Sequence, residues 1–483
     1  MRKYLLVSAE LSCWFLPATF LNYSLDLIGF KMKEIKILCP SAALGFGCPT
    51  ESFEEGLRRM PDAIGVDAGS TDPGPYYLGT GQTILGWGPQ RKDLEIYLEA
   101  QQRLDIPLII GSAGGPGCLS VLNETIRIIE EIAEENNYHF KLAKIEADFE
   151  KDFLKKCVTE DKIQRFEDRT ELSAQEIDKS EHIVAQMGVE PLIEALKLGA
   201  DVIIAGRAYD PAIFAALPIY KGFDPGLAYH MGQILECGAM AAEPAAGADA
   251  ILATVRDDSF TIEPLNKNRK ATVKSVAAHT FYENTNPVQL VFPGGMIDLS
   301  ETTFVQETDR TVRIAKTKFI PAKQYTLKLE GAKKVGHRAV FIAGIKDPIF
   351  IKSVDSIIEQ AKNEMVKQLP YKMDEDYQLI FHTYGKNAVM REREPNVDFV
   401  GHEIGLVGEA VATTQEIAYA VCSFFHKILL HYPYEGRKQI SGNLAFLYSP
   451  SNFNMGEVYE FNIYHLLNVD EGVSQFPITI SDL

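Results

Sequence analysis

The chain has 483 residues, with 48 Lys and Arg against 66 Asp and Glu, which gives a formal net charge of −18. This acidic balance argues against a protein that binds nucleic acid, because such proteins usually carry a basic surface. The hydrophobic fraction of 46% argues against a disordered chain. A chain of this length predicts two or three domains.

The first 32 residues differ from the rest of the chain. An apolar run over residues 4–20 is interrupted by Glu10, and Met32 is followed at once by a strand-like segment. We interpret residues 1–32 as a non-native or upstream extension, with a signal peptide as the alternative. No other stretch approaches the ~18 apolar residues of a membrane span, and seven scattered cysteines without a CxxC pair favour a cytoplasmic protein.

Residues 33–250 alternate short apolar runs, Gly-rich loops and amphipathic helices. This pattern predicts an α/β domain with a doubly wound, mainly parallel sheet. The predicted strands cover residues 34–39, 63–67, 107–111, 141–146 and 201–205, and the predicted helices cover 52–59, 91–103, 119–134 and 191–198. Right-handed crossovers then bring the carboxyl ends of the strands to one edge.

From residue 251 the pattern changes to alternating β-branched segments, which predict a second α+β region. We divide this region into an α+β domain over residues 251–375 and a C-terminal α+β section over 376–483. Its predicted strands cover residues 272–277, 311–318, 324–329 and 378–381, and its predicted helices cover 352–368 and 414–430.

Three of the predicted parallel strands end in loops that carry Gly together with polar side chains. These loops are DAGSTDPGP at 67–75, GSAGGPGC at 111–118 and GRAYDP at 206–211. Because open α/β sheets bind ligands beyond the carboxyl ends of their strands, we place the site at these loops.

The loop at 111–118 leads into a predicted helix. Ser112, Gly114 and Gly115 would let backbone N–H groups face a carboxylate or a phosphate. The alternative is a tight turn without a ligand. The loop matches neither the dinucleotide fingerprint nor the P-loop, so neither kind of nucleotide site is predicted.

The loop at 67–75 carries two carboxylates, Asp67 and Asp72, on either side of Ser70 and Thr71. Neighbouring carboxylates can take different pKa values and serve as acid and base, and they can also bind a divalent metal or cap turns. We assign Asp67 and Asp72 to catalysis, and Ser70 and Thr71 to substrate binding.

Arg207 directly follows a predicted buried strand, and Asp210 opens the next helix. A guanidinium at a strand end suits a substrate carboxylate. An internal ion pair between Arg207 and Asp210 is an equally weighted alternative. We place both residues in the substrate site.

A helical segment at 229–238 carries His230, Glu236 and Cys237. His230 and Glu236 are candidates for a general acid and base, while a metal site with Cys237 rests on too few ligands, and a lone Cys on a helix is more often a core residue. Glu243 lies just beyond this helix and is assigned to the same pocket.

His279 is predicted at the end of a strand, close to Tyr282. This pair suits proton transfer near a substrate, and a satisfied core histidine is an equal alternative. The chain has no GxSxG elbow, which argues against hydrolase chemistry of the α/β-hydrolase kind.

Together, five segments resemble the acyclic terpene utilisation (AtuA-like) family. They are DAGSTDPGP at 67–75, SAGG at 112–115, IAGRAYDPA at 204–212, HMGQILECGA at 230–239 and SVAAHTFYEN at 275–284. The resemblance covers residues 33 to at least 347 and extends to SGNLAF at 441–446. It implies a setting in the breakdown of branched acids through coenzyme A thioesters, with a small companion protein as a further subunit, and it assigns no catalytic residue.

From these residues and this resemblance we hypothesise a hydro-lyase (hydratase) that acts on a branched carboxylic acid or its coenzyme A thioester. Arg207 and the glycine loop would hold the carboxylate or thioester oxygen, Asp67 or Glu236 would take the α-proton, and His230 or Asp72 would protonate the leaving hydroxyl. The alternative is an accessory subunit that binds an acyl thioester without turnover.

The sequence does not firmly predict any cofactor. A divalent metal remains an option, and coenzyme A would be part of the substrate. The expected partners are a small acid or acyl thioester, a small companion subunit and further copies of the chain as a homo-oligomer. Neither nucleic acid nor a membrane is expected.

Overall fold

The computed structural model describes residues 33–167, 169–282, 286–438 and 440–483. The interpretation of residues 1–32 as an upstream extension lies outside the described residues. Within the described part of the chain, no helix is long and apolar enough to cross a membrane.

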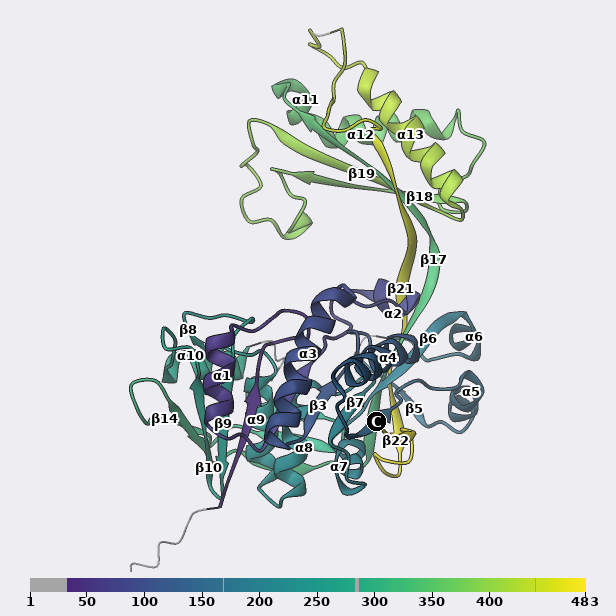
Figure 1. Ribbon diagram of the computed structural model, residues 1–483. Coiled ribbons are helices and arrows are strands. Elements are labelled where there is room, and N and C mark those ends of the chain that lie inside the picture. The colour runs from purple at the N-terminus through teal and green to yellow at the C-terminus, as the bar shows by residue number, and fades with distance from the viewer. Residues whose placement is uncertain (1–32, 168, 283–285, 439) are drawn as a thin grey trace, which may run out of the picture. The chain divides into compact units, whose positions relative to one another are not determined.

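A mixed sheet of ten strands has a parallel core in the order β1-β2-β3-β7-β4 (Figure 1). The five parallel strands are β1 (Glu34–Cys39), β2 (Ala63–Asp67), β3 (Leu108–Gly111), β4 (Lys141–Ile145) and β7 (Val202–Ala205). The prediction of these five strands is confirmed to within one residue at each end.

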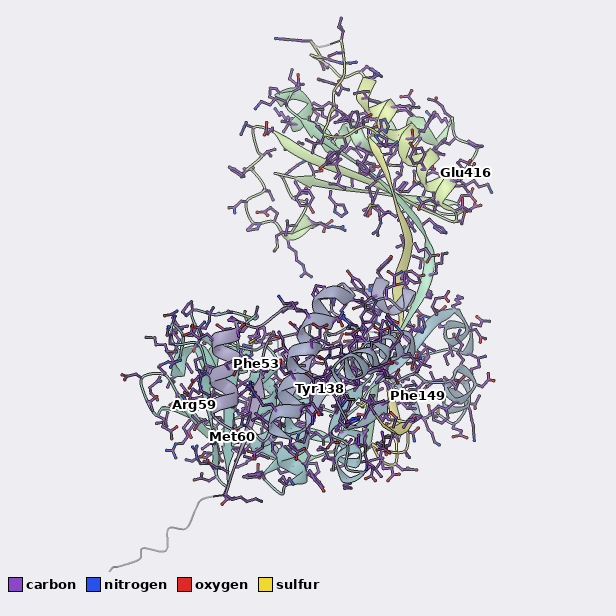
Figure 2. All side chains as sticks on the ribbon, viewed as in Figure 1. Phe53, Arg59, Met60, Tyr138, Phe149 and Glu416 are labelled. Atoms are coloured by element: carbon purple, nitrogen blue, oxygen red, sulfur yellow. The ribbon has the colours of Figure 1, made fainter. Side chains whose placement is uncertain are left out.

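Helices pack against both faces of this parallel core. Leu38 belongs to the core that contains α1 (Thr50–Arg58), α3 (Trp87–Leu104) and α4 (Leu119–Asn136). Its neighbour Ile37 belongs to the core that contains α7 (Glu190–Lys197), α8 (Asp210–Tyr220) and α9 (Pro225–Leu235). This alternation is the one expected of strands buried on both faces. Phe53 lies on α1 (Figure 2). Its ring packs against that of Tyr97 on α3, with ring centroids 5.5 Å apart. The predicted doubly wound α/β sheet is therefore confirmed.

Antiparallel strands extend the sheet at both edges, so the sheet as a whole is mixed. β9 (Ile251–Arg256) pairs with β1, and β10 (Ser259–Pro264), β15 (Val312–Ala315) and β14 (Thr303–Gln306) follow outward. At the other edge β22 (Ile478–Asp482) pairs with β4. The end of the chain thus returns to the first sheet. The domain limits at residues 250 and 375 stay a prediction.

The predicted strand at residues 272–277 is wrong, because these residues begin α10 (Val273–Phe281). Thr272 and Ser275 form a capping box, in which each side chain accepts the backbone N–H of the other at 3.0 Å. The predicted strand at 311–318 is divided into β15 and β16 (Lys318–Pro321), and Lys316 between them has φ 66°.

A second, antiparallel sheet is built on the long strand β17 (Tyr325–Ile345). On one side β17 pairs first with β6 (Ser180–Gln186) and then with β19 (Ile404–Ala412), and on the other side it pairs with β21 (Asn452–Val469). The edge strand β18 (Tyr377–Tyr384) pairs with β19. The predicted second α+β region is confirmed.

Part of this region is ferredoxin-like. The end of β17, α12 (Val354–Val366), β18, β19, α13 (Gln415–His431) and β21 follow one another as βαββαβ, with the strand order β18-β19-β17-β21. Ile358 of α12 and Phe425 of α13 share one apolar core with Phe341 of β17. The predicted helices at 352–368 and 414–430 are confirmed.

The remaining elements are α2 (Pro75–Thr80), α5 (Lys151–Thr159), α6 (Ala174–Lys179), α11 (Pro348–Lys352), β5 (Ile163–Arg165), β8 (Ala242–Glu243), β11 (Lys270–Ala271), β12 (Gln289–Phe292), β13 (Gly295–Asp298), β20 (Ala445–Phe446) and the 3₁₀ helix Arg391–Arg393.

Candidate functional site

The candidate site lies where the winding of the parallel sheet reverses. β3 and β7 are neighbours, but the chain leaves β3 for α4 on one face and leaves β7 for α8 on the other. The two loops bond to each other, since Ser112 N–H donates to Gly206 C=O at 2.9 Å and Arg207 N–H donates to Gly117 C=O at 3.0 Å. Such a reversal opens the crevice that open α/β sheets use for ligands.

The glycines of the loop at 111–118 are required by packing. A Cβ at Gly117 would lie 2.2 Å from Arg207 N, and one at Gly115 would lie 2.3 Å from Ile84. A Cβ at Gly114 would likewise lie 2.6 Å from Val121. Within the loop, the N–H of Gly115 and that of Gly117 already donate to loop carbonyls. These contacts match the alternative of a tight turn, and the anion-binding role of Gly114 and Gly115 stays a prediction.

Arg207 is the centre of a buried cluster of charges. Its side chain is 3% exposed, and its Nε donates to Glu330 Oε2 at 2.9 Å. Its Nη1 donates to Asp210 Oδ1 and to Ser112 Oγ, both at 3.1 Å. The alternative of an internal Arg207–Asp210 ion pair is therefore present, and it orients Asp210.

Glu330, which comes from β17, is the fully buried member of this cluster. Its second oxygen lies 2.8 Å from Lys328 Nζ, and Lys328 also donates to Tyr464 Oη at 3.3 Å. Burial alone raises the pKa of Glu330, but the charges of Arg207 and Lys328 outweigh burial and hold this pKa at about 2. Glu330 is thus an anion near neutral pH, and it holds the Arg207 guanidinium in place.

Asp67 ends β2 beside this cluster and is 6% exposed. Its Oδ2 accepts the Gly69 N–H at 2.9 Å, while its buried Oδ1 has no hydrogen-bond partner among the described residues. Burial, together with the charge of Asp210, raises the pKa of Asp67 well above its ordinary value, although Arg207 opposes this rise. A carboxyl group in such surroundings tends to hold its proton.

Asp210 is the accessible carboxylate of the cluster, with 26% of its side chain exposed. Burial raises its pKa, the Arg207 ion pair opposes this rise, and the charge of Asp72 adds to it. Asp72 itself is exposed and accepts the Ser70 hydroxyl at 2.7 Å, whereas Thr71 is buried. Of the carboxylates near Asp67, it is Asp210 whose charge raises the pKa of Asp67.

A second group of predicted residues gathers around Gln233 of α9. Gln233 Nε2 donates to Glu236 Oε1 at 3.0 Å, and Gln233 Oε1 accepts the Tyr209 hydroxyl at 3.3 Å. Tyr209 directly precedes Asp210, so it links this group to the charged cluster.

His279 and Tyr282 complete this second group. The prediction of His279 at a strand end is wrong, because His279 lies on α10, where its ring is 4.9 Å from that of Tyr282. Burial lowers the pKa of His279 to about 4, a hydrogen bond with the Gln233 backbone opposes this, and its Nε2 has no partner among the described residues. The Tyr282 hydroxyl lies 3.4 Å from Cys237 Sγ. His279 is therefore neutral near neutral pH.

His230 and Glu243 have other surroundings. His230 is fully buried, with its ring nitrogens 2.8 Å from Thr317 Oγ1 and 3.1 Å from Thr280 Oγ1, and burial lowers its pKa to about 3. These contacts match a buried histidine whose ring nitrogens are both satisfied, and the assignment of His230 to catalysis stays a prediction. Glu243 accepts the Thr272 hydroxyl at 2.8 Å beside the start of α10.

Sequence reasoning missed two pairs of residues near this edge. Glu330 and Lys328 lie more than a hundred residues from Arg207 and carry no local signal. Asp148 and His182 are the second pair, with Asp148 Oδ1 4.0 Å from His182 Nδ1. Burial raises the pKa of Asp148 to about 7. Asp148 could have been found, because it follows a predicted parallel strand as Asp67 and Asp210 do.

No group of three or more His, Cys, Asp or Glu side chains that could hold a metal ion occurs among the residues that the structure describes. The option of a divalent metal stays a prediction.

A family model provides the decisive comparison. The model described as acyclic terpene utilisation family protein AtuA matches residues 91–436. The chain belongs to the AtuA family. Membership in the AtuA family implies a role in acyclic terpene utilisation. The matched range includes Arg207, Asp210 and Glu330, while Asp67 precedes it. Searches of curated proteins and of solved structures found no match for this AtuA-family chain.

Proposed function

We propose that this AtuA-family chain is a hydro-lyase that adds or removes water across a double bond of a branched carboxylic acid or its coenzyme A thioester. The observation that carries the proposal is the pair Asp67 and Asp210 beside one guanidinium, at the carboxyl ends of the parallel strands, which is where open α/β sheets in general bind ligands. Two carboxyl groups in unlike surroundings can serve as acid and base at one site.

In the dehydration direction, Asp210 is the base and Asp67 is the acid. The C–H bond next to the carbonyl breaks, and its proton passes to Asp210, because burial raises the pKa of Asp210 even though the Arg207 ion pair opposes this rise. The C–O bond of the β-hydroxyl group then breaks, and the proton of Asp67 leaves with the oxygen as water. A proton passing from Asp210 to Asp67 through solvent restores both groups. Hydration follows the same steps in reverse.

Arg207 and Ser112 are positioning residues in this proposal, because their polar atoms are engaged with Asp210 and with each other. Lys328 is the more exposed of the two cations, with 22% of its side chain exposed against 3% for Arg207. We assign Lys328 to the carboxylate or thioester oxygen of the substrate. Removal of its charge should raise KM more than it lowers kcat.

The test follows the absorbance of the conjugated double bond when the full chain is mixed with branched unsaturated acids or their coenzyme A thioesters. Asp210→Asn and Asp67→Asn should each lower kcat by roughly 10²- to 10⁴-fold. Asp152→Asn is the matched control, because 98% of that side chain is exposed. Turnover that is unchanged in both active-site variants would refute the proposal.

Binding without turnover would favour the accessory-subunit alternative instead. A thermal-shift series with the same acids and thioesters distinguishes the two outcomes, since a ligand at ~100 times its Kd stabilises the chain by roughly 2.7 kcal/mol. A thioester that stabilises the chain but is neither hydrated nor dehydrated would point to a binding subunit.

A further inference from the structure

Three polar side chains that the proposed hydro-lyase does not use gather close to the carboxyl ends of β3 and β4. Ser120 lies on the first turn of α4, Asp148 follows β4, and His182 belongs to β6. A serine, a histidine and an aspartate can form a nucleophilic site, which recurs on unrelated folds and is recognised by geometry rather than by sequence spacing. The lack of a GxSxG motif therefore does not exclude such a site on these loops.

His182 and Asp148 form one half of this group. His182 Nδ1 lies 4.0 Å from Asp148 Oδ1, and the two side chains are 31% and 26% exposed. The second oxygen of Asp148 is buried and has no hydrogen-bond partner among the described residues. Hydrogen bonds of catalytic groups are often long without substrate and tighten when substrate binds. Asp148 is thus placed to orient the His182 ring.

The surroundings of His182 differ from those of His230. His230 is fully buried, and both of its ring nitrogens contact threonine hydroxyls. His182 is partly exposed, and its ring makes no hydrogen bond to any residue that the structure describes. Burial lowers the pKa of His182, so the ring is neutral near neutral pH and can accept a proton.

Gly81 brings Ser120 to the other nitrogen of the His182 ring. A Cβ on Gly81 would lie 2.5 Å from Ser120 Oγ and 3.0 Å from His182 Nε2. Both atoms therefore border the same small space, which stays open because residue 81 has no side chain. Gly81 also has φ +63°, a conformation that glycine adopts without strain.

The Ser120 hydroxyl is accessible. Ser120 is exposed, and its Oγ donates to Gly81 C=O at 3.0 Å. A hydroxyl proton rotates to suit its surroundings, so it can turn from this carbonyl toward His182 Nε2, directly or through one water. Among the described residues, the Ser120 N–H has no acceptor. An N–H of the first helical turn can stabilise negative charge that develops next to Oγ.

We propose that Ser120, His182 and Asp148 form an acyl-transfer site that hydrolyses a carboxylic ester or thioester. Ser120 Oγ bonds to the carbonyl carbon and gives its proton to His182 Nε2. The C–O or C–S bond to the leaving group then breaks, and that proton passes to the departing alcohol or thiol. Water attacks the acyl group on Ser120, and its proton returns through His182 to Oγ as the acid is released. Asp148 is a positioning residue.

Mass spectrometry of the full chain tests the covalent step. The chain is mixed with p-nitrophenyl acetate at a pH above the pKa of Asp148, which burial raises to about 7. The wild-type chain should release a burst of p-nitrophenolate and carry an acetyl group, which peptide mapping should place on Ser120. Ser120→Ala should lose the burst.

Ser356→Ala is the matched control for the nucleophile. Ser356 is likewise an exposed serine in the first turn of a helix, α12, but its hydroxyl accepts Gln360 Nε2 at 2.9 Å. This replacement should leave the burst unchanged.

Two variants test the other members of the group. His182→Ala should slow the burst by roughly 10²- to 10⁴-fold. Added imidazole should restore part of the rate, because the ring that it replaces is 31% exposed, and a purely structural role would not be rescued in this way. Asp148→Asn should lower kcat for steady-state hydrolysis more than it changes KM, because Asp148 acts on the ring and not on the substrate.

Three results would overturn the proposal. They are a wild-type chain without an acetyl group on Ser120, a burst of wild-type size in Ser120→Ala or His182→Ala, and an equal loss of the burst in Ser356→Ala. The hydro-lyase proposal rests on Asp67 and Asp210 and is tested on a double bond, so either proposal can fail without the other.

Discussion

Replacing Glu330 by Gln tests the charged cluster at the sheet edge. Glu330 is fully buried and lies between Arg207 Nε at 2.9 Å and Lys328 Nζ at 2.8 Å. Burial raises its pKa, but the two cations outweigh burial and hold the pKa at about 2, below the ordinary 4.5. At 1.36 kcal/mol per pKa unit, this difference corresponds to about 3 kcal/mol of stability at pH 7.

The sign of the pH dependence follows from the lowered pKa. An acid whose pKa falls on folding stabilises the fold above its ordinary pKa, and this stability is lost as the pH falls through the folded-state value. Urea unfolding should therefore show that Glu330→Gln costs about 3 kcal/mol at pH 7. The cost should shrink as the pH falls from 4.5 toward 2.

An exposed ion pair serves as the matched control for this substitution. Glu301 lies 2.9 Å from Lys318, but 62% of its side chain is exposed, so Glu301→Gln should cost no more than ~1 kcal/mol. The account of the cluster fails if the two substitutions cost the same, or if the cost of Glu330→Gln does not depend on pH.

Three further substitutions test other parts of the site. Gly117→Ala should lower the free energy of unfolding by roughly 1–3 kcal/mol, because its Cβ would lie 2.2 Å from Arg207 N at φ +66°; wild-type stability in urea would contradict the packing argument. His230→Ala should destabilise the fold by about 1–3 kcal/mol through lost buried hydrogen bonds, and its pH profile of turnover should keep the wild-type shape; a displaced profile would place His230 in the reaction. Asp67→Asn should stabilise the chain as the pH rises above the ordinary carboxyl range, because burial and a neighbouring charge raise the pKa of Asp67 and its ionised form costs stability; a pH-independent effect would argue against this.

The parallel strands could be predicted because each is a short apolar run that ends at a Gly-rich loop. The length of an apolar run and the Gly-rich loop that ends it are local properties of the sequence. The strand that ends at Asp67 and the strand before Arg207 can therefore be predicted from one sequence, without an alignment. The helix at His279 was missed for a local reason too. The β-branched alternation around it suggested a strand, but the capping box at Thr272 and Ser275 starts a helix.

The charged cluster itself could be predicted only in part. Arg207 and Asp210 are three residues apart, so their ion pair was an available alternative from the sequence. Glu330 could not be found, because it reaches Arg207 from the second sheet through pairing of β17 with β6. Glu330 lies far from Arg207 in the sequence and binds its guanidinium in the fold. For this reason Arg207 is a positioning residue in the proposed mechanism, whereas the sequence alone suggested that it binds the substrate carboxylate.

The central claim is that Asp210 removes a proton from the carbon beside the carbonyl of a branched acid or thioester. The most direct measurement follows the incorporation of solvent deuterium at that carbon by mass spectrometry, with the full chain in heavy water and saturated branched acyl coenzyme A thioesters or the free acids. The account predicts incorporation by the wild-type chain and by Asp152→Asn, and a loss of roughly 10²- to 10⁴-fold in Asp210→Asn. Compounds that bind to the wild-type chain but acquire no deuterium would contradict it.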